Sequence, residues 1–258
     1  MKLTEKTKSR IDAINEQIEQ YGAMTIRQIY YRLLGTMALN YRQIQTCCKQ
    51  GREAGLIKNS QIVDRSRPIY GHNTHNGMES YLTEIPDNFY LDYWGASALR
   101  PQIWTEKDAI SQILLTEANR YNVPVYVTKG FLSISNKQRW GGYNALILYF
   151  GDHDPSGLSI DQDLKNDLEY KQFKRIALTE KMIQRNSLPS IPVKKTDPRA
   201  KEYIKTHGNK AWEIDALNPS YLRSLIRRSI ENSMTFVLEH KIKRQDNIRN
   251  EIKEKLKT

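Results

Sequence analysis

The feature that most constrains the fold is an uninterrupted apolar run, Ala145 to Phe150, which leads directly into Gly151 to Gly157 with the sequence GDHDPSG. Six apolar residues followed by glycine are typical of a parallel strand covered on both faces, because an amphipathic helix needs a longer periodic segment. The turn would then lie at the carboxyl end of the strand, where open α/β sheets bind ligands. The sequence therefore predicts an α/β fold with an acidic site at one edge of its sheet.

The turn holds two aspartates one residue apart, Asp152 and Asp154. Alternate side chains of an extended segment lie on the same side, so their oxygens can converge on one hard cation such as Mg²⁺. A third acid, Glu106, ends a short strand candidate that begins near Arg100, and a helix is expected after it. The three acids form a candidate metal site, with His153 as a neighbour and not a ligand. A surface turn with spare acids is the alternative for an isolated Asp-x-Asp pair.

Composition indicates a polyanionic partner. The chain has 40 Lys and Arg residues against 29 Asp and Glu, a net charge of +11, and nucleic acid is the natural polyanion for such a balance. Charge that serves only solubility is the alternative. No apolar run approaches the roughly 18 residues that span a bilayer, and the N-terminus lacks an apolar signal core, so we expect a cytoplasmic, nucleoid-associated protein. The only cysteines, Cys47 and Cys48, are adjacent and predict no disulfide scaffold.

The first 64 residues predict three helices and a hairpin. Apolar spacing and stop signals place the helices at residues 5–21, 26–34 and 41–54, and residues 56–64 resemble a short hairpin. Three helices followed by a hairpin make a winged helix. A polar stripe on the third helix is predicted to lie in a DNA groove, and it consists of Arg42, Gln45, Lys49 and Arg52. A small helical cap with a solvated basic face is the alternative.

The second helix begins with a capping-box signature, Thr25 with Gln28, and places Tyr31 about 100° away from its apolar stripe, which includes Tyr30. Arg27 lies four residues before Tyr31 and therefore on the same face. A guanidinium beside a phenol can hold a phosphate and favour the phenolate. Because the chain has 15 tyrosines, a core position for such a pair is the common alternative.

Two resemblances give these motifs a function. A strand ending in Glu106, followed by a strand and the DHDPSG element, resembles the TOPRIM domain of topoisomerases, primases and some nucleases. The segment RQIYYR, residues 27–32, is similar to the tyrosine motif of the topoisomerase VI A subunit and the related meiotic double-strand-break transesterases, which pair a winged helix with TOPRIM.

The resemblance implies a type IIB topoisomerase-like reaction on double-stranded DNA. Tyr31 would attack a phosphate held by Arg27 and become linked to a 5′ DNA end. Asp152 and Asp154 would hold Mg²⁺, or alternatively Mn²⁺, while Glu106 joins them or moves a proton. A homodimer is implied, since the tyrosine of one subunit works with the acids of the other. The chain shows no ATP-binding motif, so strand passage would need a separate GHKL-type ATPase subunit.

The expected organisation has four parts. Residues 1–67 form the winged helix, 68–98 a connection, 99–220 a Rossmann-like TOPRIM domain and 221–258 a C-terminal helix. Arg65 and Arg67 are expected to contact phosphates, and His72 and His75 to lie in a solvated loop. Residues 212–217 are predicted to form a last strand, whose acids Glu213 and Asp215 are either ordinary edge residues or extra metal ligands.

Two other functions fit the same residues. In the first, the chain is a TOPRIM metal-dependent endonuclease of a mobile element or defence system, in which water attacks and Tyr31 only packs. In the second, the chain binds DNA without cutting it and keeps its acids for folding alone.

Overall fold

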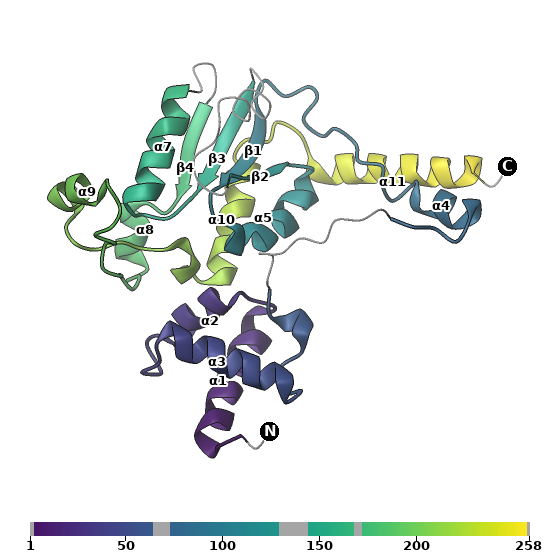
Figure 1. The fold of residues 1–258 in the computed structure, drawn as a ribbon. Helices are drawn as coiled ribbons and strands as arrows, with labels where there is room; N and C mark the ends of the chain where they lie inside the picture. The colour runs from purple at the N-terminus through teal and green to yellow at the C-terminus, as the bar shows by residue number, and fades with distance from the viewer. Residues whose placement is uncertain (1–2, 64–72, 129–143, 168–171, 257–258) are drawn as a thin grey trace.

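The computed structural model describes residues 3–63, 73–128, 144–167 and 172–256 (Figure 1). Within them, parallel strands form one sheet in the order β2-β1-β3-β4. The strands are β1 (Arg100–Thr105), β2 (Val125–Val127), β3 (Ala145–Phe150) and β4 (Gln172–Ala177). The predicted α/β class is confirmed, and β3 occupies the predicted residues.

Strand β3 is buried on both faces, as its apolar sequence predicts. Its alternate side chains Leu146, Leu148 and Phe150 join the larger core, which α5 (Ser111–Ala118) and α10 (Pro219–Glu231) cover. Ile147 and Tyr149 point to the other face and pack under α7 (Pro155–Asp167). The sheet is therefore a central layer between helices (Figure 1).

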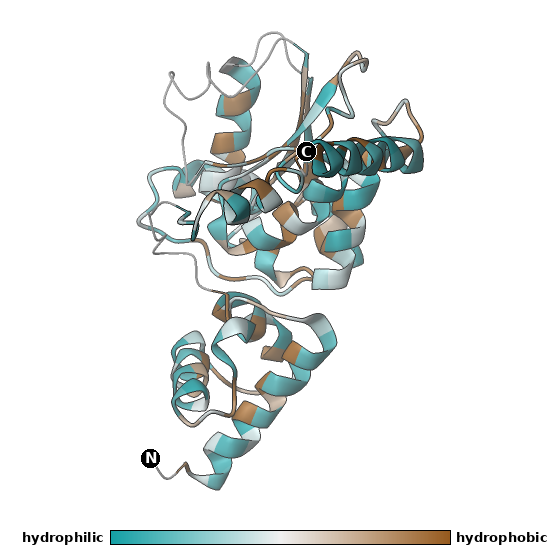
Figure 2. Cartoon of the chain, turned by 90° about the vertical axis from the view of Figure 1, so that its right-hand side faces the viewer, coloured by the Kyte–Doolittle hydropathy of each residue, from teal (hydrophilic) through white to brown (hydrophobic). Residues whose placement is uncertain are grey.

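The N-terminal helices form a separate lobe with its own apolar core. They are α1 (Glu5–Tyr21), α2 (Ile26–Leu33) and α3 (Tyr41–Glu53), close to the predicted bounds. The predicted capping box is present, because the Gln28 amide donates to the Thr25 hydroxyl at 3.2 Å and the Thr25 amide to the Gln28 side chain at 2.9 Å. Figure 2 shows the apolar residues of these helices facing one another.

The predicted hairpin at 56–64 is wrong for the part of it that the structure describes, residues 56–63. The amides of Leu56 and Ile57 donate to the Gly51 carbonyl and close α3, and Asn59–Gln61 is a short 3-10 helix. The side chains of Ile57 and Ile62 both enter the helical core, so the segment wraps around that core instead of pairing with itself. Its one bridge is parallel, between Ile62 and Met24.

The C-terminal helix expected after residue 221 is two helices, α10 and α11 (Leu238–Lys255). Asn218 caps α10 as predicted, with its side chain accepting from the Ser220 amide at 2.9 Å. Helix α11 extends away from the sheet beside α4 (Met78–Glu84) (Figure 1), and its surface is mostly hydrophilic (Figure 2). Two further helices, α8 (Glu180–Arg185) and α9 (Ala200–His207), follow β4.

The segment expected to be a connection contributes to the main core. Tyr93 and Trp94 are buried against the sheet, and the Trp94 indole donates to the Tyr121 carbonyl at 2.8 Å. None of the helices in the described ranges has the length and apolar character needed to cross a membrane.

Candidate active site

The carboxyl ends of β1 and β3 meet at one edge of the sheet. Thr105 pairs with Phe150, so Glu106 and Gly151 follow at the same level. The Glu106 carboxylate accepts a hydrogen bond from the Asp152 amide at 2.9 Å and another from the Tyr149 hydroxyl. A methyl group added at Gly151 would lie 2.6 Å from a Glu106 oxygen and 2.7 Å from the Tyr149 hydroxyl, so a larger residue there would displace these side chains. Glu106 therefore points toward the DHDPSG turn, as expected for strand ends in parallel register.

The two aspartates of the turn have different partners. Asp152 accepts from the Ile214 amide at 2.7 Å and from the Lys107 ammonium at 2.9 Å. Asp154 lies at the start of α7 and accepts from the Gly157 amide at 2.6 Å. His153, between them, is buried on the opposite side of the turn, and burial, with Arg175 and His207 adding to it, lowers its pKa to about 4.

Lys107 is the centre of a buried ion cluster. Its ammonium lies 2.7 Å from Asp215, 2.9 Å from Asp152 and 3.2 Å from Glu213, and 16% of its side chain is exposed. Burial alone would lower the pKa of Lys107, but the charges of Asp215, Asp152 and Glu213 outweigh burial and raise the pKa above its ordinary value. Lys107 is therefore charged at neutral pH.

Glu213 and Asp215 come from a segment predicted to be a strand. That prediction is wrong: Trp212 forms an isolated antiparallel bridge with His153, and Ile214–Ala216 is a short 3-10 helix. The bridge nevertheless brings both acids to the carboxyl edge of the sheet. Glu106, Asp152, Asp154, Glu213 and Asp215 are called the acidic rim below.

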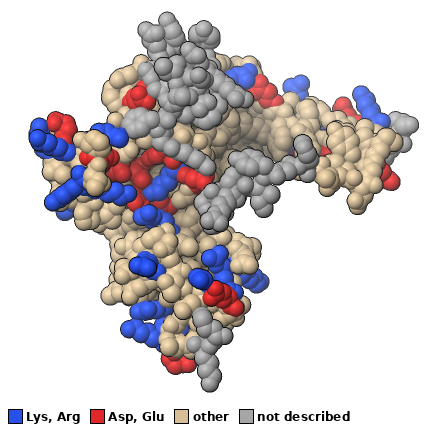
Figure 3. Space-filling model, in the orientation of Figure 1, with Lys and Arg blue, Asp and Glu red and all other residues tan. Residues whose placement is uncertain are grey.

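The acidic rim carries more negative charge than its cations balance. Burial raises the pKa values of Glu106, Asp154 and Asp215, and Asp215 is shielded from solvent almost completely. No described residue donates a hydrogen bond to the Asp215 Oδ1 atom. Figure 3 shows acidic side chains gathered on the α/β part beside the N-terminal lobe, with basic side chains among them.

The donor set of the rim suits a hard divalent cation, because every member offers carboxylate oxygens. Glu106, Asp152 and Asp154 are not gathered as tightly as a ligand set, however. Among the described residues, the group of three candidate ligands whose donor atoms all lie within 4.8 Å is a different one, His153, Glu180 and His207. The Lys107 ammonium and the Gly157 amide hold Asp152 and Asp154 instead, so these side chains must turn to share an ion.

Tyr31 is buried, although its place off the apolar stripe of α2 predicted that it could meet a phosphate; Tyr30 packs against the core as predicted. Tyr31 is 4% exposed, and its hydroxyl has no hydrogen-bond partner among the described residues. The reason is that residues 213–216 cover the face of α2 that lies off its apolar stripe. Arg27 pairs with Glu213 at 3.1 Å, and the Arg32 guanidinium donates to the Ala216 carbonyl.

The expected activation of the phenol by Arg27 is wrong for this arrangement. Burial raises the pKa of Tyr31, and the negative charge of Glu213 raises it further. Lys107 and Arg27 oppose both effects without overcoming them. The phenol is therefore neutral, although it lies within electrostatic reach of the acidic rim.

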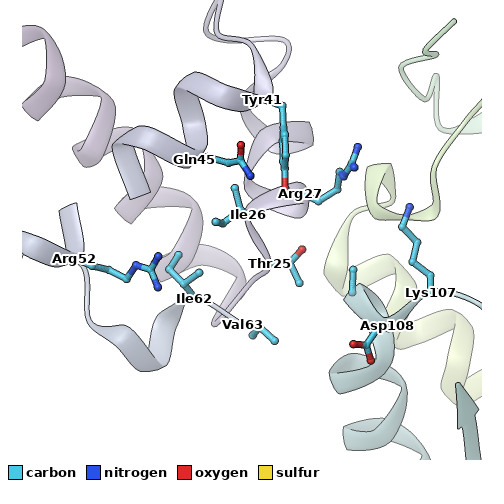
Figure 4. A pocket seen from close by; sticks show the side chains of 11 residues that line it. Thr25, Ile26, Arg27, Tyr41, Gln45, Arg52, Ile62, Val63, Lys107 and Asp108 are labelled. Carbon is cyan, nitrogen blue, oxygen red and sulfur yellow. The ribbon is translucent and has the colours of Figure 1, made fainter. Parts of the chain in front are cut away.

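A cavity of about 480 Å³ lies between the N-terminal lobe and the sheet edge (Figure 4). Arg27, Gln45 and Arg52 line it from the helical side, and Lys107 lines it from the sheet side. Tyr41, whose ring lies 4.7 Å beneath the Arg27 guanidinium, is the phenol that borders this space. The cavity therefore extends from part of the predicted DNA stripe to Lys107, whose ammonium contacts the acidic rim.

The other predicted DNA contacts lie elsewhere. Arg42 lines a second cavity, of about 420 Å³, between α1 and α3, and exposed Lys49 lies 3.8 Å from Glu53. Arg65 and Arg67, with His72, fall outside the described residues. His75 lies 3.6 Å from Glu84.

Sequence reasoning missed Lys107 and Arg175. Lys107 directly follows Glu106, so the pair of opposite charges at a strand end was the available signal. Arg175, on β4, donates to the carbonyls of Leu178 at 2.8 Å and Gly151 at 3.3 Å and also to that of Asp152. It holds the backbone of the acidic turn in place, and nothing in the local sequence indicates this role.

Comparison of the chain with known protein families and with curated protein sequences finds no match.

Proposed function

We propose that this chain cleaves DNA in a Mg²⁺-dependent reaction at the acidic rim. The observation that carries the proposal is the placement of Glu106, Asp152 and three further carboxylates at the carboxyl edge of a parallel sheet, next to a cavity with basic walls. Carboxylates at such an edge are a common site for divalent-cation and phosphate chemistry. The finer architecture belongs to the same proposal: a TOPRIM domain preceded by a DNA-binding lobe of the winged-helix type, in which residues 56–63 wrap around the helical core and do not form the hairpin of a wing.

DNA is the favoured substrate because the cavity and the whole chain are basic. Arg27, Arg52 and Lys107 line the cavity, and the chain has a net charge of +11. Guanidinium and ammonium groups bind phosphate oxygens, and a basic face raises the local concentration of a polyanion. A DNA backbone in the cavity would reach the rim at Lys107.

The roles follow from the contacts and charges of the rim. Asp152, with Glu106, Asp154 and Asp215, would hold Mg²⁺, or Mn²⁺ in its place, and the bound ion would stabilise negative charge on the departing 3′ oxygen. Glu106 has a pKa raised by burial and by Asp152, so its protonated form can donate to that oxygen.

In the tyrosine reaction, the Tyr31 oxygen forms a bond to phosphorus while the bond to the 3′ oxygen breaks. The phenolic proton passes to a rim carboxylate. Glu213 is the best placed, because among the rim carboxylates its charge has the largest effect on the pKa of Tyr31. Attack requires α2 to move away from residues 213–216, because the hydroxyl is buried. A homodimer in which Tyr31 meets the rim of the partner subunit, and a GHKL-type ATPase subunit, are further parts of this proposal.

A second candidate uses water as the nucleophile. It is favoured by the burial of Tyr31 and by its raised pKa, since both oppose formation of a phenolate. In that reaction Tyr31 serves only to pack α2 against residues 213–216.

The nucleophile is tested with supercoiled plasmid and Mg²⁺, stopped with detergent and analysed with and without protease. The tyrosine reaction predicts cut DNA that is released only after proteolysis, and loss of cutting in Tyr31→Phe. Tyr41→Phe is the matched control, because Tyr41 is the phenol that lines the cavity. Cutting by Tyr31→Phe at the wild-type rate would support attack by water, and Mg²⁺-dependent cutting that Asp152→Asn leaves unchanged would refute both candidates.

A further inference from the structure

Three side chains with nitrogen and oxygen donors meet behind the acidic turn, on the side away from the rim. They are His153 in the turn, Glu180 at the start of α8 and His207 at the end of α9. Their donor atoms all lie within 4.8 Å of one another. The Nε2 atoms of His153 and His207 lie 3.9 Å and 3.8 Å from the same Glu180 oxygen, which is too far for a hydrogen bond.

A hydroxyl group lies beside the other ring nitrogen of both imidazoles. His153 Nδ1 lies 3.1 Å from the Tyr203 hydroxyl, whose own proton is directed to the carbonyls of His153 and Lys210 at 3.1 and 3.0 Å. With that proton directed to a carbonyl, the hydroxyl oxygen is free to accept from His153 Nδ1–H, so the tautomer protonated on Nδ1 satisfies these contacts. That tautomer leaves His153 Nε2 without a proton.

His207 repeats the arrangement. Its Nδ1 lies 2.6 Å from the Thr206 hydroxyl, which donates to the Tyr203 carbonyl at 3.1 Å. In the tautomer protonated on Nδ1 the threonine oxygen accepts from Nδ1–H, and His207 Nε2 then also carries a free lone pair. In these tautomers two imidazole lone pairs and one carboxylate oxygen face a common point.

We infer that His153, Glu180 and His207 bind a divalent transition-metal ion such as Zn²⁺. Two imidazoles and a carboxylate suit such an ion and not Mg²⁺, which prefers oxygen ligands. Ligating histidines in proteins typically donate their second nitrogen to an oxygen, as His153 and His207 do here. In a tetrahedral zinc site donors are separated by roughly 3.3 Å, so the three side chains, whose donor atoms lie up to 4.8 Å apart, must turn inward to bind the ion.

Burial shows how the ion would enter and what it would do. The side chains of His153, His207 and Glu180 are 6%, 27% and 66% exposed, so the site opens to solvent on the Glu180 side. His153 lies between Asp152 and Asp154, whereas Glu180 and His207 belong to the helices that follow β4. The metal would therefore fasten the acidic turn to α8 and α9.

The test is titration of the full chain with Zn²⁺ by calorimetry, and with Co²⁺ to follow visible absorption. We expect one ion per chain, and His207→Gln or Glu180→Gln should weaken its binding by at least about 100-fold, more than the loss typical of an orienting residue. His240→Asn, an exposed histidine on α11, should bind as the wild type does. Thr206→Val should weaken binding by about 10-fold or more, because it removes only the partner of His207 Nδ1.

Unchanged affinity in His207→Gln, or no binding of Zn²⁺ by the wild type at micromolar concentration, would overturn the inference. The experiment contains no DNA and does not depend on cleavage. Asp152→Asn should keep the Zn²⁺ site, so a failure of the DNA-cleavage proposal would leave this result intact.

Discussion

Replacement of Lys107 by methionine tests the ion cluster at the sheet edge. Methionine keeps most of the packing of the lysine stem but removes the ammonium that contacts Asp152, Glu213 and Asp215 at 2.9, 3.2 and 2.7 Å. The variant strands these carboxylates in a site where Asp215 is almost fully buried. Removing one partner of a buried ion pair typically costs 3–5 kcal/mol, because the remaining charge is uncompensated.

Protonation sets an upper bound on that cost. Protonating a carboxylate whose pKa in the unfolded chain is about 3.9 costs about 4 kcal/mol of free energy at pH 7. The folded variant would accept a proton before it tolerates a greater penalty, so about 4 kcal/mol is the expected loss for one stranded charge. At pH 5 the same neutralisation costs about 1.5 kcal/mol, so the deficit should fall by roughly 2.5 kcal/mol between pH 7 and pH 5.

The sign follows from the direction of the pKa shift. Burial already raises the pKa of Asp215, and loss of Lys107 removes the main effect that lowers it. A carboxyl whose pKa is higher in the folded state binds protons preferentially there, so the free energy of unfolding rises as the pH falls. Lys107→Met should therefore approach the stability of the wild type on acidification.

Urea unfolding followed by tryptophan fluorescence is the assay. The chain has 4 tryptophans, all between residues 94 and 212, so the signal reports the α/β part and not the N-terminal lobe. Lys205→Met, which removes an exposed pair with Glu202, is the matched control and should cost about 0.5 kcal/mol. A Lys107→Met deficit below about 1 kcal/mol at pH 7, or one equally large at pH 5, would show that the Lys107 ammonium does not compensate buried carboxylate charge.

Three other outcomes follow. Mg²⁺ should raise the melting temperature of Lys107→Met more than that of the wild type, because ammonium and metal compete for the same carboxylates; equal shifts in a thermal melt would contradict this. Gly151→Ala should reduce Mg²⁺-dependent cleavage severely and cost about 1–3 kcal/mol in urea unfolding, since its methyl would lie 2.6 Å from Glu106; wild-type cleavage would count against the assigned role of Glu106. Tyr31→Phe should stabilise the chain by up to about 1 kcal/mol by circular dichroism, because it removes a buried hydroxyl without a partner; a clear loss would indicate a hydrogen bond that the phenol makes in solution.

The parts of the fold that local sequence specifies were predictable. Ala145 to Phe150 is apolar throughout, so its burial on both faces followed from composition, and the strand end at Glu106 placed that acid beside the turn. The start of α2 was predictable because Thr25 and Gln28, three residues apart, form its capping box. In each case the residues that determine the structure are close together in the sequence.

The rest depends on contacts between distant segments. Tyr31 lies off the apolar stripe of α2, as the helical wheel indicates, but the wheel cannot show that residues 213–216 cover that face. Glu213 and Asp215 reach the rim because Trp212 forms a bridge with His153 and the Ile214 amide donates to Asp152, and these contacts leave no alternating pattern in the sequence. The partnership of His153 with Glu180 and His207 depends on α8 and α9 folding back toward the turn.

Direct binding of Mn²⁺ is the most immediate test of the claim that the acidic rim holds a divalent cation. The measurement is an electron paramagnetic resonance titration of Mn²⁺ in the His207→Gln background, which removes the contribution of the histidine site. We predict one bound ion per chain, lost when Asp152→Asn is added. Binding that Asp152→Asn leaves unchanged, or no bound ion at millimolar Mn²⁺, would contradict this claim.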